Sequence, residues 1–341
     1  MSEKPVVILK PAPQQRDRIF TTAAMDRMRE HFTVIDLEEN PSEAAWEAAL
    51  PEAIAVIGQP DLDTATLARA EKLRAIFNVE GNFFPNVDYQ AAFARGIRVL
   101  GCGPAYSQAV AEFALGLALD IARGISREDR AARTGTETYF SGESSDAILL
   151  RHANVGIIGF GNLGRALRPL LTPFSPRIRV YDPWIPAGVL RELDVEPTGL
   201  EDLLHSSTFV FMLATVTSDS EHLLDARRLA MLPDGARLVL VSRAAVVDYD
   251  ALLPELVSGR LYAGIDVWPQ EPMAAADPYR AVQNAVISGH RAGGITPAFE
   301  SIGEMVLDDL DLIAAGLPPA RMQIAAPELV TRYRNRPVTR S

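Results

Sequence analysis

The chain has 341 residues, 48% of them hydrophobic and 23% charged, which is long enough for about two domains with separate cores. A net charge of −11 with scattered basic residues argues against a nucleic-acid partner, and Cys102, the only cysteine, excludes an intrachain disulfide and a cysteine-based zinc site. There is neither an apolar run of the roughly 20 residues that span a membrane nor a secretory signal pattern, so we expect a cytoplasmic protein with no membrane contact and no metal.

Short β-like runs alternate with helix-like segments over the first hundred residues. This rhythm predicts a parallel sheet with helices on its faces. The expected strands are residues 5–9, 32–37, 53–58 and 74–79, and the expected helices are residues 21–32, 42–50 and 64–73.

An Ala- and Leu-rich segment, residues 106–125, predicts a mostly buried helix. The stretch that follows it, SREDRAARTGTETYFSGESSD, is charged and contains glycine and serine, which is typical of a surface connection. We therefore place a domain boundary near this helix.

The β/α rhythm restarts after residue 150 with six apolar runs, a number that matches a doubly wound dinucleotide-binding fold. The whole chain thus predicts an α/β fold with two doubly wound parallel-sheet domains. The expected strands are residues 154–159, 177–182, 208–214, 237–242, 262–267 and 284–289, and the expected helices include residues 161–171 and 297–316.

The motif GFGNLG lies between the first of these strands and the helix that follows it. Gly159 permits a tight turn, Gly161 lets backbone N–H groups approach a pyrophosphate, and Gly164 lets the helix pack close to the strand. Asp182 ends the next strand, where a carboxylate would bind the ribose hydroxyls and repel a 2′-phosphate. The pattern predicts NAD as the cofactor; the alternative for Asp182 is a helix cap or turn residue before Pro183.

Three later strands lead into charged side chains. Arg243 follows the strand 237–242, Asp266 and Glu271 come at and after the end of the next one, and His290 follows the last. Because doubly wound sheets bind ligands at the carboxyl ends of their strands, we expect these groups near a bound nicotinamide. The alternatives are an ordinary loop histidine at 290 and a surface ion pair between Arg243 and Glu271.

Segments in this order resemble the D-isomer-specific 2-hydroxyacid dehydrogenases. They include NVDYQAAFARGIRVL, LLRHANVGIIGFGNLGRAL, LVLVSRAAVVDYDALLPELVSGRLYAGIDVWPQEP and ISGHRAG, and they extend over roughly residues 75–300. The resemblance implies an enzyme that uses NAD to interconvert a 2-keto acid and a D-2-hydroxy acid. It also implies that an NAD-binding Rossmann domain, residues 106–293, is inserted into a discontinuous flavodoxin-like substrate domain, residues 1–105 and 294–341, with the active site between them.

The resemblance further assigns the site residues. Arg243 becomes the substrate-binding arginine, His290 the acid and base, and Glu271 the carboxylate that favours its protonated imidazolium. Asp266 would hold the nicotinamide carboxamide. The implied substrate-binding residues are Val79, Glu80, Gly81, Asn82 and Arg243. The implied cofactor-binding residues are Gly159, Gly161, Asn162, Leu163, Gly164, Asp182, Thr215, Ser220, Val241, Ser242, Arg243, Asp266 and His290.

Some alternatives stay open at the level of sequence. Phe83 and Phe84 either shape the substrate pocket or pack in the core, and Arg291 either reaches an anionic substrate or is a solvated cation. Related formate dehydrogenases carry glutamine where this chain has Glu271, which argues against that activity. Oxidation of phosphite, as by a related enzyme, stays open because the motifs alone do not exclude it. The C-terminal-binding-protein corepressors retain the same charged residues, so an NAD-sensing binding protein is the alternative function. The family also uses the helix that corresponds to residues 106–125 in a two-fold dimer, so we expect a homodimer.

Overall fold

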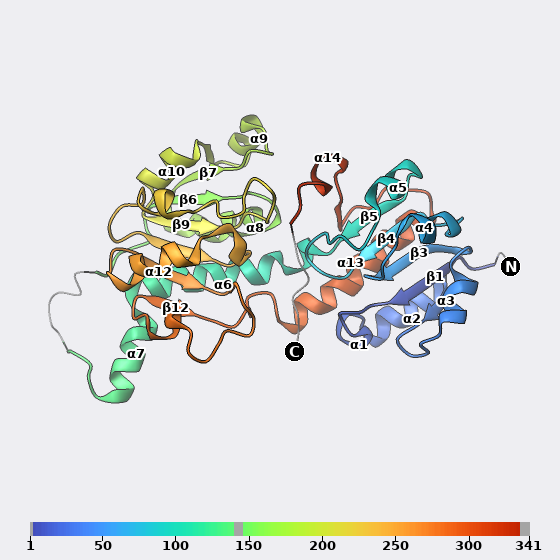
Figure 1. The fold of residues 1–341 in the computed structure, drawn as a ribbon, viewed down its shortest axis with the longest axis horizontal. Coiled ribbons are helices and arrows are strands. Elements are labelled where there is room, and N and C mark those ends of the chain that lie inside the picture. Colours follow the sequence, from blue (N-terminus) through green and yellow to red (C-terminus); the bar gives the residue numbers. More distant parts are fainter. Residues whose placement is uncertain (1–2, 140–145, 335–341) are drawn as a thin grey trace. The chain divides into compact units, whose positions relative to one another are not determined.

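The computed structural model describes residues 3–139 and 146–334. The described residues form two compact units: the first contains residues 3–106 and 294–334, and the second contains residues 107–139 and 146–293. Figure 1 labels the elements of both units, each a sheet with helices packed on it. None of the helices in the described part has both the length and the apolar composition needed to cross a membrane.

The first unit has a six-stranded sheet in the order β13-β5-β4-β3-β1-β2. Strands β1 to β5 pair in parallel, and β13 adds an antiparallel edge beside β5. The parallel order 2-1-3-4-5 is that of flavodoxin-like folds, so the predicted fold class is confirmed. The strands are β1 (Val6–Lys10), β2 (Thr33–Asp36), β3 (Ala53–Gly58), β4 (Ala75–Asn78), β5 (Arg98–Gly101) and β13 (Gln323–Ile324), and the helices are α1 (Arg16–Ile19), α2 (Thr22–His31), α3 (Glu43–Ala49), α4 (Thr64–Arg69), α5 (Tyr89–Ala94), α13 (Thr296–Ala314) and α14 (Pro327–Val330).

Helices cover both faces of this sheet. Val7 and Phe77 belong to a core shared with α2 and α13, whereas Ile8 and Val56 belong to a core shared with α3 and α4. The two cores arise because successive side chains of a strand point to opposite faces. Four helices begin at a side-chain cap that accepts a hydrogen bond from the N–H three residues later. These caps are Thr21, Ser42, Asp63 and Asp88.

The second unit has a seven-stranded, fully parallel sheet in the order β12-β11-β10-β9-β6-β7-β8. The six predicted strands are present. The seventh, β8, pairs with β7 at the sheet edge and has only two residues, too few to stand out as an apolar run. The strands are β6 (Asn154–Ile158), β7 (Arg177–Tyr181), β8 (Glu196–Pro197), β9 (Phe209–Met212), β10 (Arg237–Leu240), β11 (Tyr262–Ile265) and β12 (Ala285–Ile287), and the helices are α7 (Ile125–Thr134), α8 (Asn162–Leu171), α9 (Ala187–Glu192), α10 (Leu200–Ser206), α11 (Ala226–Leu229) and α12 (Tyr249–Val257).

The helix predicted over residues 106–125 corresponds to α6 (Gly103–Arg123). It ends earlier than predicted because Gly124 adopts a left-handed φ of 68° and begins α7. In the second unit α6 packs closely on β11, since a Cβ at Gly264 would lie 2.8 Å from Cβ of Leu117. The buried Arg237 of β10 also donates a hydrogen bond to the carbonyl of Ile121 in α6 (3.1 Å). These contacts attach α6 to the sheet that carries the candidate site.

Candidate active site

The glycine motif forms the turn between β6 and α8. Gly159 has φ +87°, and a Cβ there would lie 2.6 Å from the backbone of Ala214, so only glycine fits. Gly164 is also tightly packed, since a Cβ there would lie 3.0 Å from the carbonyl oxygen of Gly159. At Gly161 nothing lies within 4 Å of a Cβ position. The loop therefore leaves open space at the amino end of α8, where helix N–H groups bind anions, and it fits a dinucleotide pyrophosphate.

Asp182 follows β7 and connects this strand to the glycine motif. Its Oδ2 accepts a hydrogen bond from the N–H of Phe160 (2.7 Å), and its Oδ1 accepts one from the N–H of Trp184 (2.9 Å). The bond from Trp184 is the local turn contact expected if Asp182 were only a turn residue. The bond from Phe160 fixes the glycine motif to the end of β7. The partly exposed carboxylate retains lone pairs for two ribose hydroxyls.

Glu271 and His290 lie side by side at the carboxyl end of the second sheet. His290 Nδ1 is 2.8 Å from Glu271 Oε2, and Glu271 Oε1 accepts the N–H of Trp268 at 3.0 Å. Burial raises the pKa of Glu271, but the hydrogen bonds from His290 and Trp268 and the charges of His290 and Arg243 outweigh it and hold this pKa below its usual 4.5. Glu271 is therefore an anion at neutral pH, and Nε2 is the ring nitrogen of His290 turned away from it.

Arg243 follows β10 after Val241 and Ser242. Its guanidinium donates to the carbonyl of Ser242 (2.7 Å), and its charge is among those that lower the pKa of Glu271. The hydroxyl of Ser242 is buried and has no hydrogen-bond partner among the described residues. Because an unpaired buried hydroxyl is unfavourable, Ser242 fits a site that a ligand completes.

The loop after β9 contains Thr215 and Ser220. The hydroxyl of Ser220 donates to the carbonyl of Thr215 (2.7 Å) and accepts the N–H of Thr217 (2.8 Å). Ser220 is buried, whereas Thr215 is exposed. Ser220 thus stabilises this loop through hydrogen bonds to its backbone. Direct contact of either residue with the cofactor stays a prediction.

Asp266 directly follows β11 and is fully buried. Its carboxylate accepts hydrogen bonds from the residues around His290. The predicted contact with the nicotinamide carboxamide stays a prediction. Arg291, beside the histidine, has an exposed side chain, which favours its interpretation as a solvated cation.

In the first unit, the predicted substrate loop Val79–Asn82 follows β4. The side chain of Val79 is buried in the core, so this residue can offer only its backbone to a ligand. A Cβ on Gly81 would lie 3.3 Å from the ring of Tyr106, which keeps the backbone close to α6. The carbonyl of Glu80 accepts the N–H of Cys102 (3.4 Å). These contacts hold the loop against the end of β5.

Phe83 and Phe84 follow this loop, and the sequence left open whether they shape the substrate pocket or pack in the core. Phe83 stacks on Tyr333 with ring centroids 5.7 Å apart and is 5% exposed, and Phe84 is 4% exposed, which favours core packing for both. Asn78, which the sequence analysis passed over, is fully buried at the end of β4, and neither polar atom of its side chain has a partner in the described part of the chain. The only signal in the sequence was an asparagine within an apolar run.

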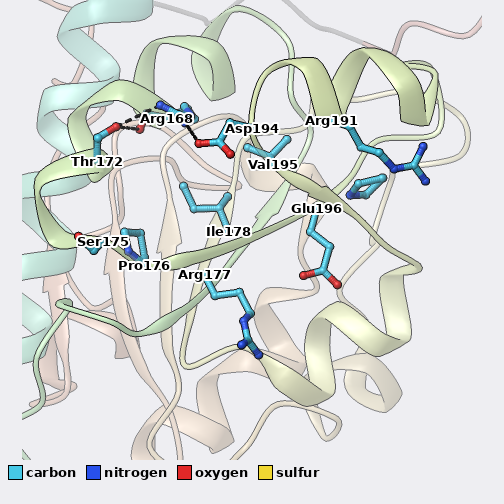
Figure 2. Close-up of a pocket in the computed structure, with 11 residues that line it drawn as sticks. Arg168, Thr172, Ser175, Pro176, Arg177, Ile178, Arg191, Asp194, Val195 and Glu196 are labelled. Atoms are coloured by element: carbon cyan, nitrogen blue, oxygen red, sulfur yellow. Dashed lines mark hydrogen bonds and ion pairs between the residues drawn. The ribbon is translucent and has the colours of Figure 1, made fainter.

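A cavity lies at the amino end of β7, the end opposite the one that Asp182 follows (Figure 2). It is lined by residues at the amino ends of β7 and β8, among them Arg177 and Glu196, and by Arg168 of α8, which pairs with Asp194. None of the predicted site residues lines it. Ligands of doubly wound sheets bind at the carboxyl ends of the strands, so this cavity is not part of the candidate site. Within residues 3–139 and 146–334, no group of three or more His, Cys, Asp or Glu side chains is arranged to hold a metal ion.

Comparison with known proteins shows which family this chain is similar to. The family model described as "D-isomer specific 2-hydroxyacid dehydrogenase, NAD binding domain" matches residues 115–292, slightly more than half of the chain. The chain belongs to the D-isomer specific 2-hydroxyacid dehydrogenase family. The predicted resemblance is confirmed, and with it the two-sheet fold, the enzyme class and NAD as the cofactor of this dehydrogenase.

Named members of the family are similar over most of their length. A hydroxypyruvate reductase from Thermotoga maritima is 31% identical over 245 residues, which are 70% of this dehydrogenase and 78% of that protein. A glyoxylate reductase from Thermococcus gammatolerans is 29% identical over 319 residues, 89% and 95% of the two chains. The crystal structure of a phosphoglycerate oxidoreductase from Rhizobium etli shares 41% identity with a TM-score of 0.87 and covers 96% of this dehydrogenase and 100% of that chain.

Proposed function

We propose that this dehydrogenase reduces a 2-keto acid to the D-2-hydroxy acid with NADH, with His290 as the acid in reduction and the base in the reverse reaction. The observation that carries the proposal is the 2.8 Å contact between His290 Nδ1 and the ionised Glu271. It lies at the carboxyl end of the sheet that also carries the glycine motif. A partly buried anionic partner at hydrogen-bond distance is not expected for an ordinary loop histidine.

The proposed roles follow from the charges that develop during reduction. NADH supplies the hydride when it is bound. As hydride reaches C2, negative charge grows on the carbonyl oxygen, and an imidazolium can both stabilise that charge and donate a proton to it. With Nδ1 held by Glu271, His290 would donate this proton from Nε2.

Substrate orientation is assigned to Arg243 and the loop 79–82. A guanidinium presents planar, paired donors that match a carboxylate and its adjacent carbonyl. The backbone of Val79–Asn82 would bind the same carboxylate, because the Val79 side chain is committed to the core. Together these contacts would fix C2 for hydride transfer.

Cofactor contacts are assigned to the groups that fit a dinucleotide. The open loop at Gly161 with the amino end of α8 at Asn162 and Leu163 would receive the pyrophosphate, and Asp182 would receive the adenosine ribose. The hydroxyl of Ser242, which has no partner among the described residues, would gain a hydrogen bond from a bound cofactor. We assign the NAD-binding role to residues 106–293 and the substrate-binding role to residues 1–105 and 294–341.

The direct test is NADH oxidation by the purified protein with a panel of 2-keto acids: glyoxylate, hydroxypyruvate, pyruvate, and bulkier aryl and branched examples. We expect turnover with at least one of them and a D-configured product. Tight NADH binding without turnover on the whole panel would contradict the proposal. It would favour the alternative, an NAD-sensing binding protein on the same scaffold.

We also propose that the dehydrogenase is a homodimer. Helix α7, which follows α6, has no buried residue, and Ile125 at its start is 57% exposed. An exposed amphipathic helix next to an apolar one supports a contact with a second copy. Sedimentation velocity at micromolar concentration should give the mass of a dimer; a stable monomer would contradict this assignment.

A further inference from the structure

His290 lies in a short loop, residues 288–292, that holds it in an unusual backbone conformation. Its φ is +53°, in the left-handed region that residues other than glycine rarely adopt. Such a conformation persists only where the surrounding contacts impose it. Four hydrogen bonds to this loop are accepted by one residue, Asp266.

The carboxylate of Asp266 is fully buried (0% exposed). It accepts the hydroxyl of Ser288 (2.5 Å) and the N–H groups of Arg291 (2.8 Å) and Ala292 (2.9 Å). The backbone carbonyl of Asp266 accepts the N–H of His290 itself (2.7 Å). The donors lie on both sides of His290, so one residue defines the path of the backbone before and after the histidine.

The same strand end also holds Glu271. Trp268, two residues after Asp266, donates its Nε1–H to the carbonyl of Ser288 (2.7 Å) and its backbone N–H to Glu271 Oε1 (3.0 Å). Trp268 is thus bonded both to the loop 288–292 and to the carboxylate of Glu271. Residues 266 and 268 therefore hydrogen-bond to both sides of the 2.8 Å contact between Glu271 and His290.

We propose that Asp266 is a positioning residue: its buried carboxylate fixes the loop 288–292 so that His290 Nδ1 meets Glu271 and Nε2 is directed to the substrate. The inference rests on the proposed acid–base role of His290. It differs from the predicted contact with the nicotinamide carboxamide, in which Asp266 would act on the cofactor. Both carboxylate oxygens are already engaged by donors of the histidine loop.

Asp309 of α13 provides a matched control within the same chain. It is also fully buried, and its carboxylate accepts the N–H groups of Ala320 (2.7 Å), Arg321 (2.9 Å) and Met322 (2.7 Å). The loop that it holds belongs to the first unit and contains none of the proposed catalytic residues. Replacement by asparagine has the same local effect at both positions, because an amide N–H₂ then faces backbone N–H donors.

The test compares Asp266→Asn, Ser288→Ala and Asp309→Asn. We expect Asp266→Asn to lower kcat about 10²-fold while the Kd of NADH changes less than about threefold, because displacing a catalytic group by about 1 Å has effects of this size. Ser288→Ala removes one of the three bonds to the carboxylate and should lower kcat by a smaller factor. Asp309→Asn should leave kcat unchanged and lower only the Tm.

A second readout does not depend on turnover. The imidazole C–H cross-peak of His290 in the NMR spectrum of the ligand-free protein can be assigned by its loss in His290→Ala. We expect Asp266→Asn to shift this cross-peak at constant pH and Asp309→Asn to leave it in place. An unshifted cross-peak with normal kcat, or with a defect confined to NADH affinity, would overturn the inference. Absence of turnover in the unmodified protein would contradict the proposed function instead, and the cross-peak would still decide the role of Asp266.

Discussion

The carboxyl ends of the two sheets carry different chemistry. In the second unit, the strands β10, β11 and β12 lead to Arg243, Glu271 and His290, all of them charged or titratable. In the first unit, β4 ends at the neutral Asn78, and the loop after it begins with Val79, whose side chain is in the core, and continues with the partly buried Glu80. We infer that the second unit holds the proposed acid–base pair, whereas the first contributes the backbone of the loop 79–82 to substrate binding.

The charged and the neutral polar groups at these strand ends differ in how their hydrogen bonds are satisfied. Glu271 has hydrogen bonds to both oxygens, and Asp266 has three hydrogen bonds to its carboxylate. The polar side-chain atoms of two neutral residues, Ser242 in the second unit and Asn78 in the first, have none within the described residues. A charged side chain therefore needs a complete set of hydrogen-bond partners to keep one geometry. A neutral amide can stay unpaired until a ligand binds.

The largest effect should come from His290→Ala. Loss of a general acid typically lowers the rate by about 10²-fold or more, so we expect kcat to fall by at least that factor while NADH binding is largely retained. Steady-state kinetics with the best 2-keto acid and fluorescence titration with NADH measure the two effects. Activity close to that of the unmodified protein would contradict the assignment of the reacting groups to the second unit.

A smaller effect is expected from replacing Asp182, which we propose binds the adenosine ribose of the cofactor. The kcat/KM for NADH should exceed that for NADPH, and removal of the repelling carboxylate in Asp182→Asn should narrow the ratio by about tenfold. Asparagine can still accept the N–H of Phe160, whereas Asp182→Ala loses this bond and should weaken binding of both cofactors. A preference of the unmodified protein for NADPH would show that Asp182 does not read the ribose.

The smallest effect should come from Asn78→Leu in the first unit. Removal of an unpaired buried amide should raise the Tm by about 2–4 °C. The KM of the 2-keto acid should change by no more than about a few-fold, and kcat should stay the same. The control is Asn86→Leu, which loses a bond from Nδ2 to the carbonyl of Pro60 (3.0 Å) and should lower the Tm. A fall in kcat as large as that of His290→Ala would contradict the assignment of the chemistry to the second unit.

Local pattern explains what could be predicted from the sequence. The apolar runs, the glycine motif and the charged residues at strand ends are encoded within a few neighbouring positions, so the six strands of the second sheet followed from them. The pairing of Glu271 with His290 was implied by the resemblance to the family and not by local pattern, since the two residues are 19 positions apart. The two-residue β8 and the end of α6 at Arg123 were missed because short pairing and a single left-handed glycine leave little periodic signal.

Long-range hydrogen bonds explain what could not be predicted. The sequence placed Asp266 at a strand end, but its three donors come from residues 22 to 26 positions later, and only the folded path of the loop 288–292 brings them to the carboxylate. Burial of Asn78 likewise depends on the elements packed around the end of β4. Neither feature has a local pattern that distinguishes it from an ordinary turn residue.

The most direct test of the proposed chemistry is the pH profile of kcat for 2-keto acid reduction in Glu271→Gln. The low pKa of Glu271 makes it an anion at neutral and alkaline pH, and this anion favours the imidazolium that donates the proton. Glutamine retains the size of the side chain without the charge, so the loss of activity with rising pH should begin at a lower pH in the variant. An identical pH profile in Glu271→Gln and the unmodified protein would contradict His290 as the acid paired with Glu271.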